Sequence, residues 1–260
     1  MASDGAVSKD ANLPTCTIVG VGPGLSSAIA ERFAQGGYAV GLIARSKPVV
    51  RMLSERLSDL GEAAWACADA GDEHALQNAL IAVEQRLGPT DVLIYNASVM
   101  RAEGALAVSP ATIRAEFDVN LIGALISAQH VAPGMVARGS GTVLFTGGGL
   151  ALEPYPEWAS LALGKAALRN LAFSLYKELA PKNVHVAIVA VCGIVEEGGL
   201  FDPRSIAQEY WRLATQPIGV HDREAIIQPP GSDPYYNDAE RCHQATSLPP
   251  LHIQTGGEIE

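Results

Sequence analysis

Several features are missing from the 260-residue sequence, and their absence narrows the possible functions before any motif is considered. No run of lysines or arginines occurs, and 28 acidic against 18 basic side chains give a net charge of −10. Because nucleic-acid phosphates are bound by clustered basic surfaces, we expect no nucleic-acid partner. No stretch reaches the ~20 apolar residues of a membrane span. The polar segment Met1–Pro14 also lacks the apolar core of a signal peptide, so we expect no membrane partner.

Metal-binding patterns are absent as well. The six histidines show no ligand spacing, and the four cysteines are scattered singly with no C-x-x-C pair: Cys16, Cys67, Cys192 and Cys242. Three of these cysteines lie in apolar runs that indicate buried strands or strand ends. The pattern predicts no metal site and reduced thiols in a cytoplasmic protein, with disulfides as the less favoured alternative.

The sequence does contain an alternation of short apolar runs with longer segments of helical periodicity. The predicted strands are Cys16–Gly20, Tyr38–Ile43, Ala63–Cys67, Asp91–Tyr95, Thr142–Thr146, Val184–Val191 and Glu224–Gln228. The predicted helices are Leu25–Gln35, Val49–Leu60, His74–Leu87, Pro110–Ala137, Trp158–Leu179 and Ile206–Leu213. Strands that are apolar on both faces and separated by helices form a parallel sheet covered on each side. The order predicts a single α/β domain with a doubly wound parallel sheet of the Rossmann type.

The composition divides the chain into three parts. Residues 1–14 form a polar N-terminal segment, residues 15–228 form the Rossmann domain, and residues 229–260 form a tail rich in proline and glycine at its start. Two interpretations of the tail stand side by side. It is either mobile, or an arm that lies across a neighbouring subunit or over the pocket and buries its few apolar side chains there.

A glycine-rich loop follows the first predicted strand and leads into the first predicted helix. Its residues include Gly20, Gly22, Gly24 and Leu25. Such a turn lets the backbone approach a pyrophosphate, and the helix N-terminus supplies free N–H groups and a partial positive charge. The loop predicts a dinucleotide site; the alternative is a tight turn without a ligand.

The end of the second predicted strand bears on the choice of cofactor. A site for NAD usually has a carboxylate there that binds the ribose 2′-hydroxyl, whereas this chain has Ala44 and Arg45. A guanidinium matches the oxygens of a 2′-phosphate. Arg45 therefore favours NADP(H) over NAD(H), and the alternatives are a solvated arginine or no cofactor at all.

From Thr15 to Gln228 the chain resembles the short-chain dehydrogenase/reductase family. The loop from Gly20 to Leu25 is similar to that family's glycine-rich motif, with Ser26 in place of the last glycine. The resemblance implies several roles, on residues that follow the family's motifs in order. They are an adenine contact at Asp69 and Ala70, a cofactor contact at Asn96 and Ala97, a catalytic asparagine at Asn120, a catalytic and ribose-binding lysine at Lys165, and a cofactor-binding loop at Gly193.

Two residues depart from the catalytic part of this pattern. Leu161 stands four residues before Lys165, where the family has tyrosine, and Gly148 stands thirteen residues before Leu161, where it has serine. In the family the tyrosine transfers a proton and the serine orients the substrate oxygen. Leucine and glycine do neither, and a positioned general acid contributes ~10²–10⁴-fold. The ordinary carbonyl/alcohol chemistry is therefore expected to fail.

Glu197, beside Glu196, is a third departure, because it stands where the family has a threonine near the nicotinamide. A carboxylate there is unfavourable near a pyrophosphate: like charges at 4 Å cost ~4 kcal/mol at a surface-like dielectric. Either Glu197 turns away, or it is protonated, or the loop does not close over a dinucleotide.

Four ionisable groups near the pattern are candidates to replace the missing acid. Glu157, four residues before Leu161, is expected on the same helix face as Lys165, and Tyr155 just upstream is expected at the mouth of the pocket. Glu157 or Tyr155 is the hypothesis for a general acid/base, with Glu196 and Glu197 as the other two groups. The alternative is a solvated glutamate and a packed tyrosine.

Three function classes remain open. We favour an atypical NADP(H)-dependent oxidoreductase acting on a small organic substrate. The alternatives are a non-redox enzyme, such as a cyclase, isomerase or lyase, that reuses the pocket, and an inactive cofactor sensor or partner subunit. The resemblance implies a homodimer or homotetramer packed through the helices Pro110–Ala137 and Trp158–Leu179.

Overall fold

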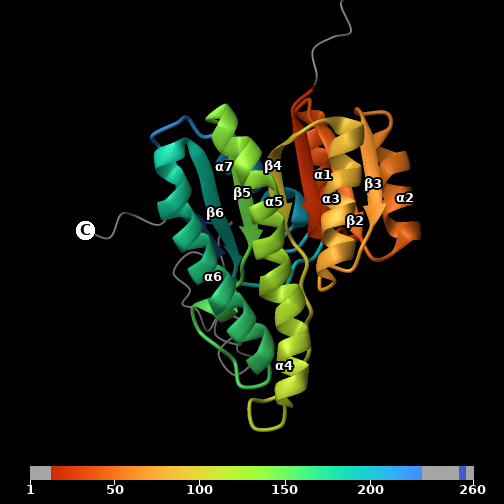
Figure 1. Ribbon diagram of the computed structural model, residues 1–260. Coiled ribbons are helices and arrows are strands. Elements are labelled where there is room, and N and C mark those ends of the chain that lie inside the picture. The colour runs from red at the N-terminus through yellow and green to blue at the C-terminus, as the bar shows by residue number, and fades with distance from the viewer. Residues whose placement is uncertain (1–12, 230–251, 256–260) are drawn as a thin grey trace, which may run out of the picture.

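A single eight-stranded sheet runs through the molecule in the order β3-β2-β1-β4-β5-β6-β7-β8 (Figure 1). The computed structural model describes residues 13–229 and, for the backbone, residues 252–255. β1 to β7 pair in parallel, and β8 pairs antiparallel to β7. The strands are β1 (Thr15–Val19), β2 (Ala39–Ala44), β3 (Ala63–Cys67), β4 (Thr90–Tyr95), β5 (Gly141–Thr146), β6 (Val184–Val191), β7 (Glu224–Gln228) and β8 (His252–Thr255). The predicted doubly wound α/β fold is confirmed.

Helices cover both faces of the sheet. They are α1 (Leu25–Gln35), α2 (Lys47–Leu57), α3 (Glu73–Leu87), α4 (Pro110–Phe117), η1 (Asp118–Ile122), α5 (Gly123–Arg138), η2 (Gly149–Ala151), α6 (Ala159–Leu179), η3 (Ala180–Lys182) and α7 (Pro203–Ala214). Apolar residues of α1, α2 and α7 form one core cluster against the sheet, and those of α3, α5 and α6 form a second. The helices of the second cluster lie over the face turned toward the viewer in Figure 1.

Side-chain caps explain where three of the helices begin. The carboxylate of Asp72 accepts from the N–H of Ala75 at the start of α3. Ser109 caps α4, whose first residue is Pro110, and Asp202 caps α7. Each cap satisfies a backbone donor that has no partner within its helix.

The predicted helix Pro110–Ala137 is not one regular helix, which corrects the expectation. α4 and α5 are joined by η1, a π-helical segment. In its wider turn, the carbonyl of Val119 accepts a hydrogen bond from the buried hydroxyl of Tyr95 on β4. This bond ties the irregular turn to the sheet, and π segments of this kind are frequent at functional sites.

The same helical run, Pro110–Arg138, is long and apolar enough to cross a membrane by length and composition alone. Its α5 part packs on the sheet, with Ala124, Val131 and Met135 buried in the second core cluster. That is the position of a core helix in an α/β domain.

The C-terminal part differs from the prediction in one respect. We expected the last strand at Glu224–Gln228, but β8 adds a further strand at the edge of the sheet, with Gln228 paired to His252. A four-residue strand in a polar segment has too little pattern to be recognised from the sequence. Most of the predicted tail, residues 230–251 and 256–260, lies outside the described residues, as do residues 1–12 of the predicted N-terminal segment.

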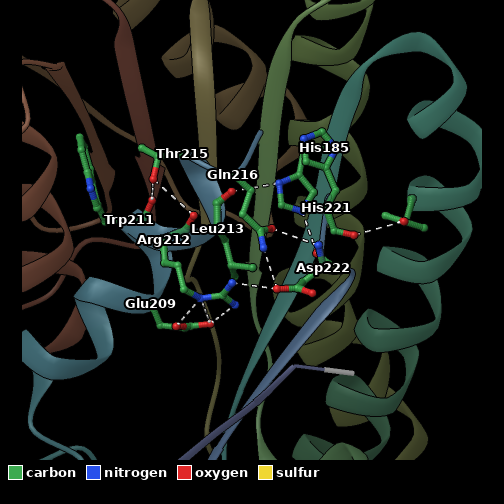
Figure 2. A network of polar contacts seen from close by, with 10 residues as sticks. His185, Glu209, Trp211, Arg212, Leu213, Thr215, Gln216, His221 and Asp222 are labelled. Carbon is green, nitrogen blue, oxygen red and sulfur yellow. Dashed lines mark hydrogen bonds and ion pairs between the residues drawn. The ribbon is translucent and has the colours of Figure 1, made fainter. Parts of the chain in front are cut away.

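A polar network joins the C-terminal end of α7 to the amino-terminal end of β6 (Figure 2). Arg212 pairs with the buried Glu209 and, at 2.8 Å, with Asp222. The ring of His185, which is 2% exposed, lies between the carbonyls of Leu213, 3.1 Å from Nδ1, and Asp222, 2.7 Å from Nε2. Because His185 stands near the start of β6, the network lies at the end of the sheet where the parallel strands begin.

Candidate functional site

A large cavity lies at the opposite end of the sheet, where the parallel strands end. Its volume is about 770 Å³, and it extends across the ends of β1 to β6. The residues that line it include Gly20, Val21, Leu25, Arg45, Ser46, Asp69, Ala70, Asn96, Ala97, Ser98, Val99, Met100, Thr146, Gly148, Tyr155, Trp158, Leu161, Lys165, Gly193, Ile194 and Val195. The chain order reverses between β1 and β4, and this switch point is where doubly wound sheets bind their ligands.

The glycine-rich loop forms one wall of the cavity, and its first position, Gly20, can hold only a glycine. Gly20 has φ +89°, and a Cβ there would lie 2.2 Å from the backbone nitrogen of Ala97. The Asn96 amide donates to the Gly20 carbonyl at 2.9 Å, so the ends of β1 and β4 are fastened together. This contact fixes the loop against the sheet.

The rest of the loop shapes the start of α1. Ser26 is buried; its hydroxyl accepts from the Gly22 N–H at 2.8 Å, and it is not among the residues that line the cavity. The serine therefore braces the loop and does not fill the cavity. Gly22 and Gly24 also lie outside the lining. No side chain caps the N-terminus of α1 and its first turn holds no acidic residue, which leaves the positive end of the helix dipole for an anion.

Arg45 and Asp69 lie together at the far end of the cavity. The Arg45 guanidinium is 3.7 Å from the Asp69 carboxylate, and both side chains are largely exposed. An exposed pair of this kind contributes little to stability. The Asp69 carboxylate also accepts from the N–H of Gly71 at 2.9 Å, so Asp69 is held while Arg45 is left the freer of the two to meet a ligand.

Lys165 and Asn96 are connected through Thr146 at the end of β5. The Lys165 ammonium donates to the Thr146 carbonyl at 2.7 Å, and the Thr146 hydroxyl donates to the Asn96 side-chain oxygen at 3.0 Å. The hydroxyl of Tyr210, on α7, is 2.7 Å from that of Thr146. Burial lowers the pKa of Lys165 to about 8, because the charged form loses its hydration.

Asn120 is 3% exposed and lies on η1, outside the lining of the cavity. Its side-chain oxygen accepts from the Val99 N–H at 2.7 Å, and its amide donates to the Val99 carbonyl at 3.3 Å. Both polar atoms are used to hold the loop after β4. This segment, which does line the cavity, is the part of the site that Asn120 positions.

Leu161 and Gly148 both line the cavity, at the positions where the resemblance implies tyrosine and serine. Leu161 lies one turn before Lys165 on α6 and is 4% exposed. A Cβ on Gly148 would meet nothing closer than 3.7 Å, so a small side chain would fit there in ordinary contact with Lys165. The sequence reasoning missed Ser98, whose hydroxyl is buried without a hydrogen-bond partner in a residue that lines the cavity.

The two main candidate acids, Glu157 and Tyr155, differ in their position relative to the cavity. α6 begins at Ala159, so Glu157 precedes the helix, and its expected alignment with Leu161 and Lys165 is wrong. Glu157 is exposed and does not line the cavity, whereas Tyr155 does. Among the described residues, the ionisable side chains in the lining are Arg45, Asp69, Tyr155 and Lys165.

The loop after β6 carries the remaining candidates. Gly193 lines the cavity, while Glu196 and Glu197 are exposed and lie outside its lining. Of the three alternatives for Glu197, this position corresponds to a side chain turned away from the cavity. Within residues 13–229, no group of three or more His, Cys, Asp or Glu side chains is placed to hold a metal ion. Cys16, Cys67 and Cys192 are free, and Cys242 lies outside the described residues.

A doubly wound parallel sheet with a cavity at its switch point defines the protein as one of the Rossmann-fold class. A family model described as short chain dehydrogenase matches residues 14–200. The chain therefore belongs to the short-chain dehydrogenase family of oxidoreductases.

Individual relatives agree with this assignment. The 3-oxoacyl-[acyl-carrier-protein] reductase of Bos taurus is 25% identical over 177 residues, which cover 67% of this chain and 73% of that protein. A metagenomic short-chain oxidoreductase solved in complex with NADP is 27% identical, with a TM-score of 0.75 over 81% of this chain and 95% of that one. A short-chain dehydrogenase from Rhodopseudomonas palustris is also 27% identical, with a TM-score of 0.76 over 83% and 98% of the two chains.

Proposed function

We propose that the protein is an NADP(H)-dependent oxidoreductase that acts on a small organic substrate without the Ser-Tyr-Lys chemistry of its family. The main observation in favour of NADP(H) is Arg45. It lines the cavity just after the end of β2, where an NAD site has a carboxylate. The relative solved with NADP supports the choice, at 27% identity.

The cavity fits a dinucleotide on several counts. The loop at Gly20 is shaped by the close approach of β4, and the N-terminus of α1 is uncapped. Bound NADP(H) would supply the hydride. In this chain, Arg45 would bind the 2′-phosphate, Asp69 and Ala70 would border the adenine, and Lys165 would bind a ribose hydroxyl with N–H groups that Thr146 leaves free.

The atypical centre is the second part of the proposal. Leu161 and Gly148 remove both hydroxyls of the family pattern, so the proton must come from another group. Tyr155 is the candidate from the sequence analysis that lines the cavity. The same two residues also favour the second candidate function, a non-redox enzyme that keeps the pocket, since neither leucine nor glycine supports carbonyl reduction. We further propose a homodimer or homotetramer packed through α5 and α6.

Titration calorimetry with NADPH and, separately, NADH tests the cofactor assignment. We expect micromolar NADPH binding, which corresponds to about −8 kcal/mol, and weaker NADH binding. Arg45→Ala should weaken NADPH binding by roughly 10–100-fold, because a charge-assisted hydrogen bond contributes about 1.5–3 kcal/mol, and should leave NADH binding unchanged.

Arg51→Ala is the matched control. Arg51 is an exposed arginine on α2 that pairs with Glu55 and does not line the cavity, so its loss should change neither affinity. If the wild-type protein binds neither nucleotide, the oxidoreductase proposal fails and the non-redox alternative replaces it.

A further inference from the structure

Lys165 is a buried amine that faces a cavity without a carboxylate partner. Its side chain lines the cavity and is only 9% exposed. One hydrogen bond, to the Thr146 carbonyl, orients the amine. In the part of the chain that the structure describes, no ion pair includes Lys165. An unpaired ammonium in such a place is costly, so burial shifts the equilibrium toward the neutral amine.

The part of the cavity beside this amine is bordered mainly by apolar side chains. Leu161 lies one helical turn away, and Gly148 brings no side chain to this wall, where a Cβ would be in ordinary contact with Cε of Lys165 at 3.9 Å. The wall continues with Val99, Met100, Trp158, Ile194 and Val195. An apolar molecule that enters the cavity therefore lies against the same wall as Lys165.

Charged groups on the elements that pack against α6 do not cause the lowered pKa of Lys165. α6 packs against β6, η1, η2, η3, α4 and α5. The charged or titratable residues on these elements are Asp118 on η1, Arg114 and Glu116 on α4, His130 and Arg138 on α5, Lys182 on η3 and His185 on β6. The cause of the lowered pKa of Lys165 is burial. Within the cavity, Asp69 is held by Arg45 and Gly71 at the far end. Half of the Lys165 amines are thus neutral near pH 8.

We propose that Lys165 forms an imine with apolar aldehydes or ketones that enter the cavity. The lone pair of Nζ forms a bond to the carbonyl carbon, and the electron pair of the C=O π bond moves to oxygen. The oxygen takes up the two protons that the amine loses and leaves as water, so the products are the imine and one water molecule. This chemistry goes beyond the proposed function, because it requires no nicotinamide and does not depend on cofactor binding.

Reductive trapping tests the proposal on the full-length protein. Cinnamaldehyde is added with sodium cyanoborohydride, which reduces an imine to a stable secondary amine, and labelled lysines are located by peptide mass spectrometry. Lys47, Lys177 and Lys182 are exposed and serve as internal references. A lysine with pKa near 8 is neutral in about a hundredfold larger fraction at pH 8 than one at the ordinary value of about 10.4. We expect Lys165 to be labelled at least tenfold faster than the references, with a midpoint near pH 8.

Substitutions at two positions sharpen the test. Leu161→Asp places a carboxylate one turn from the amine and favours the ammonium, so labelling of Lys165 at pH 8 should fall about tenfold below that of the isosteric, neutral Leu161→Asn. Lys165→Met should lose the label at this position while its circular dichroism stays that of the wild type. Labelling of Lys165 no faster than that of the exposed lysines, or equal labelling in the two Leu161 variants when both are folded, would overturn the proposal.

Discussion

His185 makes the stability of this protein depend on pH. The ring is buried, and burial, as the largest cause, lowers its pKa from 6.5 to about 4, with the nearby His221 adding to the decrease. The hydrogen bonds with the two backbone carbonyls raise the pKa, but burial has the larger effect. The folded protein therefore holds the neutral ring at pH values where the unfolded chain binds a proton.

The magnitude follows from linkage. Because the pKa is lower in the folded state, the contribution of His185 is fully present above pH 6.5 and is lost as the pH falls toward 4. The difference between 6.5 and about 4, at about 1.36 kcal/mol for each pH unit, corresponds to about 3 kcal/mol. The free energy of unfolding should fall by this amount, in addition to the loss from the protein's carboxylates.

Urea titrations at several pH values from 7.5 to about 4 measure this dependence. His185→Gln keeps an amide donor but cannot take up a proton, so its free energy of unfolding should fall by about 3 kcal/mol less than that of the wild type over this range. His74→Gln, at an exposed position on α3, is the control and should keep the wild-type dependence. If the His185→Gln and wild-type curves run parallel, the inference that the buried ring is neutral is wrong.

Three further predictions test other parts of the structure. Gly20→Ala should lower the free energy of unfolding by about 1–3 kcal/mol or more, because of the positive φ and the clash of the added Cβ with Ala97. Gly22→Ala should be tolerated, and thermal unfolding compares the two variants. Leu161→Tyr combined with Gly148→Ser should increase NADPH-dependent reduction of simple ketones by roughly 10²–10⁴-fold, measured as NADPH consumption. No increase would contradict the proposal that Leu161 and Gly148 prevent this reaction. Arg169→Ala should lower the free energy of unfolding, measured in urea, by about 3–5 kcal/mol, because it leaves the buried carboxylate of Glu224 on β7 unpaired. A decrease below about 1 kcal/mol would contradict this reasoning.

The elements of the fold could be predicted because they depend on local patterns. α1 and β3 have the predicted bounds, since their apolar periodicity and flanking glycines are contained in a few neighbouring residues. The boundary of α6 could not be placed as well, because the prolines and aromatic residues before Ala159 leave the first turn undecided. The helix begins one residue later than predicted, and Glu157 lies two residues before its start.

The candidate site was predictable only in part. The loop at Gly20 and the arginine at the end of β2 follow from motifs, and both line the cavity. The sequence could not show that Asn120 is engaged by the backbone of Val99, because a partner 21 residues away is chosen by packing and not by pattern. The unpartnered hydroxyl of Ser98 had no signal beyond its place in a motif.

By itself, the sequence determined the order of the seven parallel strands and of the main helices between them, and the absence of a hydroxyl at Leu161 and Gly148. These are properties of chemical identity and local periodicity, which need no knowledge of distant contacts. Only the tertiary structure decided that Lys165 is an unpaired amine at the wall of a cavity, and that His185 is enclosed by carbonyls from two other segments. Burial and pairing depend on residues that are far apart in the chain, and they determine the charge state on which the chemistry depends.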